Sequence, residues 1–575
     1  MITTLKSLCL KAIIDENLTL HKYLNSNDIE ISKTKNKKFG HFQLNSIMKL
    51  AKIANQNPML LAKKIELRIK KNIKNNEITT NTSYPGFINF TFSEIYINQA
   101  FKKMLKNNNY KNEKKNRKNI IIDYSSPNIA KDMHVGHLRS TIVGECLSNV
   151  LHYLGNKIIK INHLGDWGTQ FGILINYLKE KYTNENINKT NITLSQLSNY
   201  YKTAQIKFNN DIHFKINSKK EVVKLQKKDK SSIKIWKKIT TISKHEYKKI
   251  YSLLNINIKY KGESFYNEML PSLIKKIENK KMITQSQNAK CIYINGFKNK
   301  EGKPLPIIIQ KSDGGFNYTT TDLAAIYYRI KYNKAQKIIY ITDAGQSNHF
   351  EMLFRLTEKL KLNTNNTTLI HIPLGLMLNT DGKKIKTRSG KSEKLIDFLQ
   401  TSITNTKKII KNKNKNKKNI SKHAEIIGIN TIKYAELSNK ISQNYIFDYQ
   451  KILQYNGNTA SFLMYAYVRL NSIKNKIKNI TIKEYNINIK KQEELDLIIH
   501  LLQFKHTIKK TAHELNPNIL TLYLYELSEK FHSFFHQCKV INSNNENSRI
   551  KTCQLTQKIL KNGLKLLGLK TLNKM

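Results

Sequence analysis

The sequence predicts an α/β protein in which a parallel-sheet domain follows a smaller α+β domain and precedes an all-helical bundle. The first observation is a strand–loop–helix pattern that recurs three times between residues 119 and 360. The second is the almost unbroken helical periodicity after residue 395. The third is the length of 575 residues, which is enough for three or four domains.

The composition is strongly basic. The chain is 39% hydrophobic and carries 99 lysines and arginines against 41 aspartates and glutamates, for a formal net charge of +58. This balance favours a polyanionic partner, with nucleic acid the first choice. A second explanation stays open, because Lys, Asn and Ile crowd the whole chain, as in KNKNKNKKNI, and a codon bias towards A and T enriches these residues everywhere.

The cysteines and the hydropathy indicate a cytoplasmic protein. The five cysteines are scattered without C-x-x-C or zinc-site spacing, which predicts reduced thiols and no zinc. No run of about 18 apolar residues exists, so we expect no membrane partner.

The first domain is predicted over residues 1–112. Amphipathic helices alternate there with a strand-like end, YPGFINFTF at 84–92, whose Pro-Gly pair is a turn signal. The polar, lysine-rich stretch at 106–119 has the composition of a linker.

The parallel-sheet domain is predicted over residues 113–395. Its three units begin with NIIIDYS, KIIKINHLGDWG and KIIYITDAGQ, and ligands of such sheets bind at the carboxyl ends of the strands. A charge-rich helical stretch at about 185–280 interrupts the units and predicts an insertion.

The remaining chain is predicted to be helical, with a connector at 396–450 and a bundle at 451–575. SFLMYAYVRLNSI and CQLTQKILKNGLKLLGL are its clearest amphipathic segments. Because Tyr465 and Tyr467 are two residues apart in the first of these, at least one of them is expected in the core.

Two histidines flank a valine and a glycine where the first helix of the sheet domain should begin. Backbone N–H groups at a helix start lack partners, so His134 and His137 can join them in binding phosphate. Gly136 has no side chain and lets a flat base or ribose approach the backbone. Helix-capping histidines and a zinc pair are the alternatives, although no third zinc ligand is evident.

The loop before these histidines, DYSSPNIAKDM, offers Asp123, Asn128 and Lys131. Asp123 ends an apolar strand at the carboxyl edge of the sheet, where it suits either a cationic group or a turn. Lys131 can counter phosphate charge, or it is one more solvated lysine.

Three further candidates lie downstream. FNYTTTDLAA contains Tyr318 and Asp322, and DAGQSNHF contains Gln346 at the end of a strand. Asp322 either caps a helix together with Thr319 or presents its carboxylate to a cation. The glycine-punctuated basic loop at 375–390 either closes over a triphosphate or is simply solvated.

In this order, the segments resemble the arginyl branch of the class I aminoacyl-tRNA synthetases. His134-Val135-Gly136-His137 is similar to the H-I-G-H signature, and SSPNIAKDMHVGHLRST and NHLGDWGTQFG resemble longer stretches of arginyl enzymes. NGNTASFLMYAYVR and CQLTQKILKNGLKLLG resemble the helical anticodon-binding domain, and PGFINF the end of the N-terminal domain that contacts the tRNA elbow. The resemblance covers nearly the whole chain and implies a Rossmann-like catalytic domain.

The second signature of the family, K-M-S-K-S, is poorly kept. Lys386-Thr387-Arg388-Ser389-Gly390 stands in its place, a departure that is usual among arginyl enzymes. The resemblance implies that Lys131 supplies the missing charge.

The resemblance implies a role for each candidate residue. The implied catalytic residues are His134, His137 and Lys131. The implied ATP-binding residues are His134, Gly136, His137, Met377, Lys386 and Arg388. The implied arginine-binding residues, of which Asp322 faces the guanidinium, are Asp123, Asn128, Tyr318, Asp322 and Gln346. The signature itself comprises Asn128, Ile129, Ala130, Lys131, Asp132, Met133, His134, Val135, Gly136, His137 and Leu138.

The implied activity is the ATP-dependent attachment of L-arginine to its tRNA through an arginyl-adenylate, formed only after tRNA has bound. The resemblance also implies a monomer that takes ATP with Mg²⁺ and has no tightly bound cofactor. Three alternatives stay open: a small-molecule nucleotidyltransferase with the same H-x-G-H element, another class I synthetase, and an RNA-binding relative without the chemistry.

Overall fold

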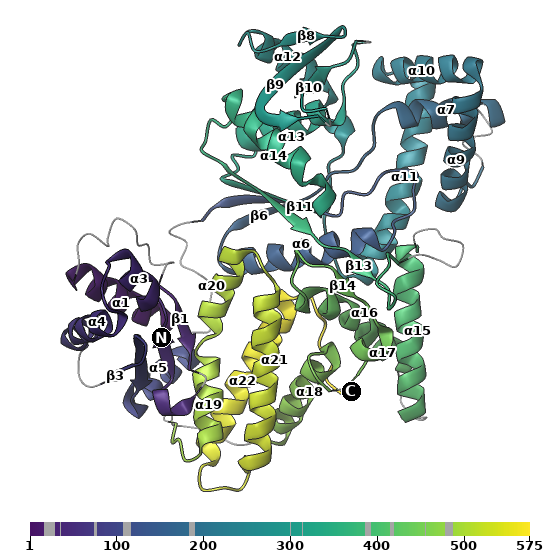
Figure 1. Cartoon of the computed structure of the whole chain (residues 1–575). Coiled ribbons are helices and arrows are strands. Elements are labelled where there is room, and N and C mark those ends of the chain that lie inside the picture. Colours follow the sequence, from purple (N-terminus) through teal and green to yellow (C-terminus); the bar gives the residue numbers. More distant parts are fainter. Residues whose placement is uncertain are drawn as a thin grey trace.

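The computed structural model in Figure 1 has three successive regions. It describes residues 1–16, 29–34, 36–73, 77–106, 117–182, 190–299, 301–312, 314–385, 393–413, 419–454, 456–477 and 487–574. The N-terminal region lies beside α19 and α20 of the C-terminal bundle, and the central sheet lies above that bundle in the view.

The N-terminal region is an α+β unit around a four-stranded antiparallel sheet of order β1-β2-β4-β3. Phe42, Ile88 and Phe90 of the sheet are fully buried under the helices. The elements are α1 (Ile2–Glu16), β1 (Ile31–Lys33), η1 (Lys37–Phe39), β2 (Phe42–Leu44), α3 (Ile47–Ile53), α4 (Pro58–Asn72), β3 (Ile78–Ser83), β4 (Phe87–Phe92) and α5 (Glu94–Lys106).

The central region is built on a five-stranded, wholly parallel sheet of order β12-β11-β5-β6-β7. Its strands are β5 (Asn119–Asp123), β6 (Lys157–Asn162), β7 (Lys259–Tyr260), β11 (Lys337–Asp343) and β12 (Thr368–Leu374). Ile120, Ile121 and Ile122 are buried because helices cover both faces of the sheet, which explains the continuous apolar run.

Helices and a second, antiparallel sheet of order β10-β9-β8 surround the parallel sheet. The elements are α6 (Gly136–Tyr153), α7 (Thr169–Lys181), α9 (Leu194–Asn210), α10 (Ile212–Gln226), α11 (Lys230–Leu253), η3 (Glu263–Met269), α12 (Leu270–Glu278), β8 (Thr284–Ser286), β9 (Ala289–Lys298), β10 (Pro304–Gln310), α13 (Tyr318–Lys331), η4 (Ala344–Gln346), α14 (Ser347–Lys359) and β13 (Met377–Leu378).

The structure differs from the predicted insertion at one point. Helices α9, α10 and α11 occupy the stretch expected to be helical, but β7 also falls inside 185–280 and pairs with β6 in the parallel sheet. The helical segment therefore ends before Lys259. A strand of two residues carries too little periodicity to be seen in the sequence.

The C-terminal region is a helical bundle, except for β14, which pairs in parallel with β13 of the central region. Its elements are α15 (Leu395–Lys413), α16 (Ile420–Ser438), β14 (Tyr445–Ile446), α17 (Tyr449–Ile452), α18 (Ala460–Lys476), α19 (Gln492–Leu501), α20 (Phe504–Glu514), α21 (Asn518–Gln537) and α22 (Glu546–Leu566). Among the described residues, no helix is both long enough and apolar enough to cross a bilayer.

Strand order determines where a ligand fits. The chain runs from β5 through β6 to β7 on one side of the sheet and then returns to β11 and β12 on the other side of β5. The connections after β5 and β11 therefore lead away from each other and leave a crevice at the carboxyl ends of these strands.

Candidate active site

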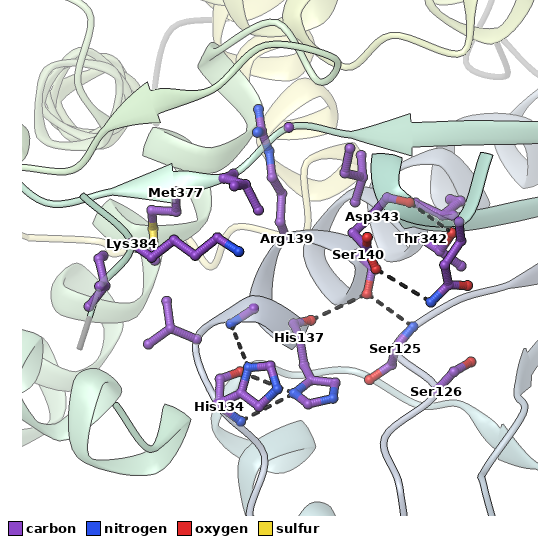
Figure 2. A pocket seen from close by; sticks show the side chains of 18 of the residues that line it. Ser125, Ser126, His134, His137, Arg139, Ser140, Thr342, Asp343, Met377 and Lys384 are labelled. Carbon is purple, nitrogen blue, oxygen red and sulfur yellow. Dashed lines mark hydrogen bonds between the residues drawn. The ribbon is translucent and has the colours of Figure 1, made fainter. Parts of the chain in front are cut away.

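A pocket of about 340 Å³ opens at this crevice (Figure 2). Met377 and Lys384 lie on one side of it, Thr342 and Asp343 on the opposite side, and His134 and His137 on a third. The full lining is Ser125, Ser126, Asn128, His134, Val135, Gly136, His137, Arg139, Ser140, Ile341, Thr342, Asp343, Gln346, Leu374, Gly375, Leu376, Met377, Lys384 and Ile385.

The two imidazoles lie at the start of α6, with ring centres 4.0 Å apart. Nδ1 of His134 accepts a hydrogen bond of 3.1 Å from the Gly136 N–H, so the ring proton of the neutral form is on Nε2. Burial lowers the pKa of His137 to about 3, and burial together with the Lys131 ammonium lowers the pKa of His134. Both rings are therefore neutral hydrogen-bond donors near pH 7.

The loop between β5 and the histidines holds a strained backbone. Ser125, Ser126 and Ala130 have φ of 75°, 47° and 64°, in the left-handed region that residues other than glycine rarely adopt. Asn128 forms an isolated parallel bridge with Gly165. A Cβ at Gly165 would lie 2.2 Å from Oδ1 of Asn128, so only glycine leaves room for this amide.

Asp322 lies beside the pocket, on the first turns of α13. Nε2 of His349 lies 2.8 Å from one of its carboxylate oxygens, and Nε2 of His163 lies 3.5 Å from the other. His163 directly follows Asn162, whose Oδ1 accepts the N–H of the pocket residue Ser126 at 2.9 Å. Asp322 does not itself line the pocket, but these contacts link its surroundings to the loop that does.

Asp322 does not cap α13, which was its alternative role. Asn317 is the N-cap, and its side chain accepts the N–H of Thr320 at 3.2 Å. The side chain of Asp322 is 24% exposed and is hydrogen-bonded to Nε2 of His349 instead.

Glu263 is a further carboxylate of this site that the sequence patterns did not reveal. Burial, together with the negative charges of Asp322 and Asp166, raises the pKa of Glu263 to about 8. A cation placed among these groups would relieve their repulsion. His163 and His349 were also missed, although each lies inside a quoted segment, NHLGDWGTQFG and DAGQSNHF respectively.

Asp123 is buried and already has a partner. One of its carboxylate oxygens lies 2.6 Å from Nη2 of the fully buried Arg329, and the other accepts the Ser126 hydroxyl at 3.1 Å. In the structure this side chain therefore anchors the strained loop to α13.

The remaining predicted residues are placed as follows. Tyr318 is 64% exposed at the rim, with its ring 5.2 Å from that of His349. Lys131 is outside the pocket lining, and its Nζ lies 5.1 Å from the centre of the Tyr201 ring. Lys386 and Arg388 lie outside the described residues.

Arg139 of α6 lines the pocket and contacts the C-terminal region. The sequence patterns did not single it out. Arg139 donates to the backbone carbonyls of Gln443 and Lys440 at 2.8 and 2.9 Å. Its Nε lies 3.4 Å from the fully buried carboxylate of Glu436, which accepts the hydroxyl of Tyr445. This buried cluster joins the start of α6 to α16 and β14.

Comparison with known proteins shows to which family the chain belongs. Three family models match successive parts of the chain: the arginyl tRNA synthetase N terminal domain at 8–92, the catalytic domain of tRNA synthetases class I (R) at 99–449, and the DALR anticodon binding domain at 463–575. The chain belongs to the arginyl family of class I tRNA synthetases.

Relatives of this family match over nearly the whole length. The arginine–tRNA ligase of Protochlamydia amoebophila is 44% identical over 558 residues, which cover 95% of this chain and 94% of that protein. The ligase of Chlamydia caviae is 42% identical over 580 residues, with 100% and 99% covered.

Solved structures agree with the fold. The arginyl-tRNA synthetase of Plasmodium falciparum superposes with a TM-score of 0.84 at 31% identity and covers 100% of this chain and 98% of its own. The Thermus thermophilus arginyl-tRNA synthetase shares the fold, with a TM-score of 0.80 at 16% identity and coverage of 100% and 99%. The predicted family, fold class and enzyme class are confirmed, and the nucleotidyltransferase and the other class I synthetases are excluded.

Proposed function

We propose that the site activates L-arginine with ATP and then transfers the arginyl group to arginine tRNA. The observation that carries this proposal is the position of Asp322. Its carboxylate lies 2.8 Å from Nε2 of His349 and 3.5 Å from Nε2 of His163, whose neighbour Asn162 binds the loop that lines the pocket of His134 and His137. An amino acid with a cationic end therefore fits with its carboxylate directed towards a nucleotide.

The arginine side chain would occupy the acidic end of the site. Asp322 accepts from the planar guanidinium, Glu263 neutralises it from a second direction, and the exposed ring of Tyr318 covers it at the rim. Asn128 and Gln346, which both line the pocket, hold the α-amino and carboxylate ends. Polar recognition of this kind rejects substrates that lack the cation.

ATP would lie across the start of α6, with its Mg²⁺ arriving as part of the substrate complex. Nε2–H of His134, His137 and the helix N-terminus donate to phosphate oxygens. Met377 packs against the adenine, while Lys384 offsets charge on the departing pyrophosphate. Lys131, outside the lining on the loop before His134, would add a second positive charge. Lys386 and Arg388 belong to the same proposed ATP-binding set.

The chemistry needs positioning rather than a covalent intermediate on the protein. An oxygen of the arginine carboxylate attacks the α-phosphorus, the bond from that phosphorus to the bridging oxygen breaks, and pyrophosphate leaves. A ribose hydroxyl of the tRNA then attacks the carbonyl carbon of the adenylate, and AMP leaves. Neutral imidazoles donate to the phosphate throughout and stabilise the charge that develops on it.

The tRNA anticodon would stack on an aromatic platform of α18 and α21. Tyr465 is 42% exposed, and the guanidinium of Arg469 lies 4.8 Å from the ring centres of both Tyr465 and Phe535. The ring of His532 stacks 5.8 Å from that of Tyr465. Tyr467 is 5% exposed and belongs to the core, as expected for one of the two tyrosines.

The proposed division of labour follows the expected domains. Residues 1–112 contact the tRNA elbow, 113–395 carry out the chemistry with a helical insertion at about 185–280, 396–450 connect, and 451–575 bind the anticodon. We propose a monomer, as the resemblance implies. The five buried thiols suit the cytoplasm.

Aminoacylation of bulk tRNA with each amino acid in turn tests the proposal. We expect charging with arginine alone, dependent on ATP. Charging with any other amino acid, or none with arginine, would contradict it.

A further inference from the structure

Helix α11 of the inserted segment presents three hydroxyl groups to the strained loop of the active site. Ser243, Tyr247 and Tyr251 are spaced by four residues and therefore lie on one face of the helix. Ser243 and Tyr247 are completely buried, and Tyr251 is 4% exposed. Buried hydroxyls need partners, and all three find them at or next to the loop.

The first two hydroxyls bind the loop backbone. Oγ of Ser243 accepts the N–H of Ala130 at 3.0 Å. The hydroxyl of Tyr247 lies 2.7 Å from the carbonyl oxygen of Asn128 and 2.8 Å from that of Lys131. Its one proton therefore forms a bifurcated hydrogen bond to the two carbonyls on either side of the bend. Ala130, at the centre of this bend, is one of the residues with positive φ.

The third hydroxyl holds the beginning of the loop. The oxygen of Tyr251 lies 2.7 Å from Oγ of Ser125, the first residue of the loop with positive φ, and accepts the side-chain N–H of Asn162 at 2.8 Å. Thr141 of α6 donates to the same Ser125 oxygen at 2.9 Å. The hydroxyl of Tyr251 thus ties the loop to the end of β6.

A loop with several disfavoured φ values keeps its shape only if its surroundings hold it. The loop places Asn128 in the pocket and leads directly into His134. Phenylalanine would fill nearly the same space as Tyr247. What the tyrosine hydroxyl adds is therefore its hydrogen bonds to the loop.

We propose that Ser243, Tyr247 and Tyr251 are positioning residues for adenylate formation, which makes the inserted helix a working part of the active site. The inference rests on the proposed roles of Asn128 and His134. The three hydroxyls set the backbone of residues 125–131, and that backbone sets the alignment of the arginine carboxylate with the α-phosphate.

Tyr247→Phe tests this, assayed by arginine- and tRNA-dependent ATP–pyrophosphate exchange. We expect kcat to fall by about tenfold to a hundredfold, because small misplacements of reacting groups are costly. The KM values for ATP and arginine stay within about twofold, because binding groups are intact and only alignment is lost. The melting temperature falls by no more than about 4 °C.

Tyr200→Phe is the matched control. It also removes a tyrosine hydroxyl from the inserted helices, but one that contacts the hydroxyl of Tyr182 at 2.9 Å instead of the loop. We expect its kcat to equal that of the wild type. A kcat loss of the same size in both variants would overturn the proposal. So would an active-site titration showing that a smaller number of active molecules accounts for the whole kcat loss of Tyr247→Phe.

If Tyr247→Phe does not fold, Tyr251→Phe decides by the same criteria. Wild-type kcat in the decisive variant, or a changed KM at unchanged kcat, would overturn the positioning role. Failure of the proposed function is separate, because it would appear as absent exchange in the wild type or as full exchange in His134→Ala.

Discussion

At the scale of single residues, two imidazoles form one end of the proposed site and three carboxylates form the other. The pKa of His137 is lowered by burial, and that of His134 by partial burial and the Lys131 ammonium, so both rings are neutral near pH 7 and suit hydrogen-bond donation to a phosphate. Burial and the negative charges of Asp322 and Asp166 favour the protonated form of Glu263, so its raised pKa marks a place where a cation would be stabilised. The two ends of the site therefore select opposite charges.

His134→Ala is expected to lower ATP–pyrophosphate exchange by at least about a hundredfold, because a donor to the developing charge is lost. Filter binding should show unchanged affinity for tRNA. His152→Ala, at the exposed end of the same helix, is the control and should behave as the wild type. Equal exchange rates in both variants would refute the phosphate role of His134.

Asp322→Asn is expected to weaken arginine binding by about tenfold to a hundredfold, the usual worth of a hydrogen bond to a charged group. Isothermal titration calorimetry measures this directly, and the KM for ATP serves as the internal control. Matching losses for both ligands would count against guanidinium recognition by Asp322.

The affinity for arginine should depend on pH through Glu263. Because the pKa of this group is raised to about 8 in the free enzyme, it is mostly protonated at neutral pH. A bound guanidinium favours the ionised form, so binding releases a proton, and the Kd for arginine should fall as pH rises from about 6 towards 8 and then level off.

Titrations in buffers of different ionisation enthalpy measure the released proton. Glu263→Gln should bind arginine more weakly at pH 8 and lose this pH dependence. A wild-type affinity that is constant across this range would show that Glu263 does not meet the guanidinium.

At the scale of elements, the chain uses apolar runs for strands and strained loops for chemistry. Three strands could be predicted because each is a short run rich in β-branched residues that is followed by a loop and then a helical pattern. β12 was missed because Pro373 interrupts its run and no helix follows it closely. By our proposal, the three hydroxyls on one face of α11 position the active-site loop, so an inserted helix also contributes to the site.

The platform on α18 and α21 predicts the behaviour of Tyr465→Ala. We expect the KM for tRNA to rise by about tenfold through the loss of one base-stacking contact, with the KM for arginine unchanged. Steady-state aminoacylation measures both constants. Tyr332→Ala, which removes a ring that is 56% exposed at the C-cap of α13, is the control. Equal tRNA constants in the two variants would place the anticodon elsewhere.

At the scale of the whole molecule, the helical bundle and the catalytic sheet form one structure around Arg139. The N–H of Gly375 donates to the carbonyl of Ile441 at 2.9 Å, and β13 pairs with β14, so both regions build the wall of the pocket that contains Gly375 and Met377. The carboxylate of Glu436 balances the buried Arg139 charge beneath that wall.

Glu436→Gln is expected to lower the free energy of unfolding by about 3 kcal/mol, because it leaves a buried guanidinium without its counter-charge. The KM for ATP should rise as well, since Arg139 lines the pocket. Thermal and denaturant unfolding measure the first effect, with Glu529→Gln at an exposed position as the control. Identical stability of the two variants would show that the Arg139–Glu436 pair does not hold the regions together.

The sequence by itself determined the features that depend on neighbours along the chain. The buried runs of β5, β6 and β11, the helix start at Gly136 and the pair His134–His137 all follow from local periodicity and spacing. The family resemblance followed from the same short motifs and from their order along the chain, both of which can be read directly from the sequence.

Only the tertiary structure decided which distant groups meet. His163, Glu263 and His349 surround Asp322 because four different segments converge on one edge of the sheet. The partnership of Asp123 with Arg329, and of Tyr247 with the loop at Asn128, likewise join residues more than 100 positions apart. Such contacts arise from how whole elements pack, and no periodicity or spacing in the chain encodes them.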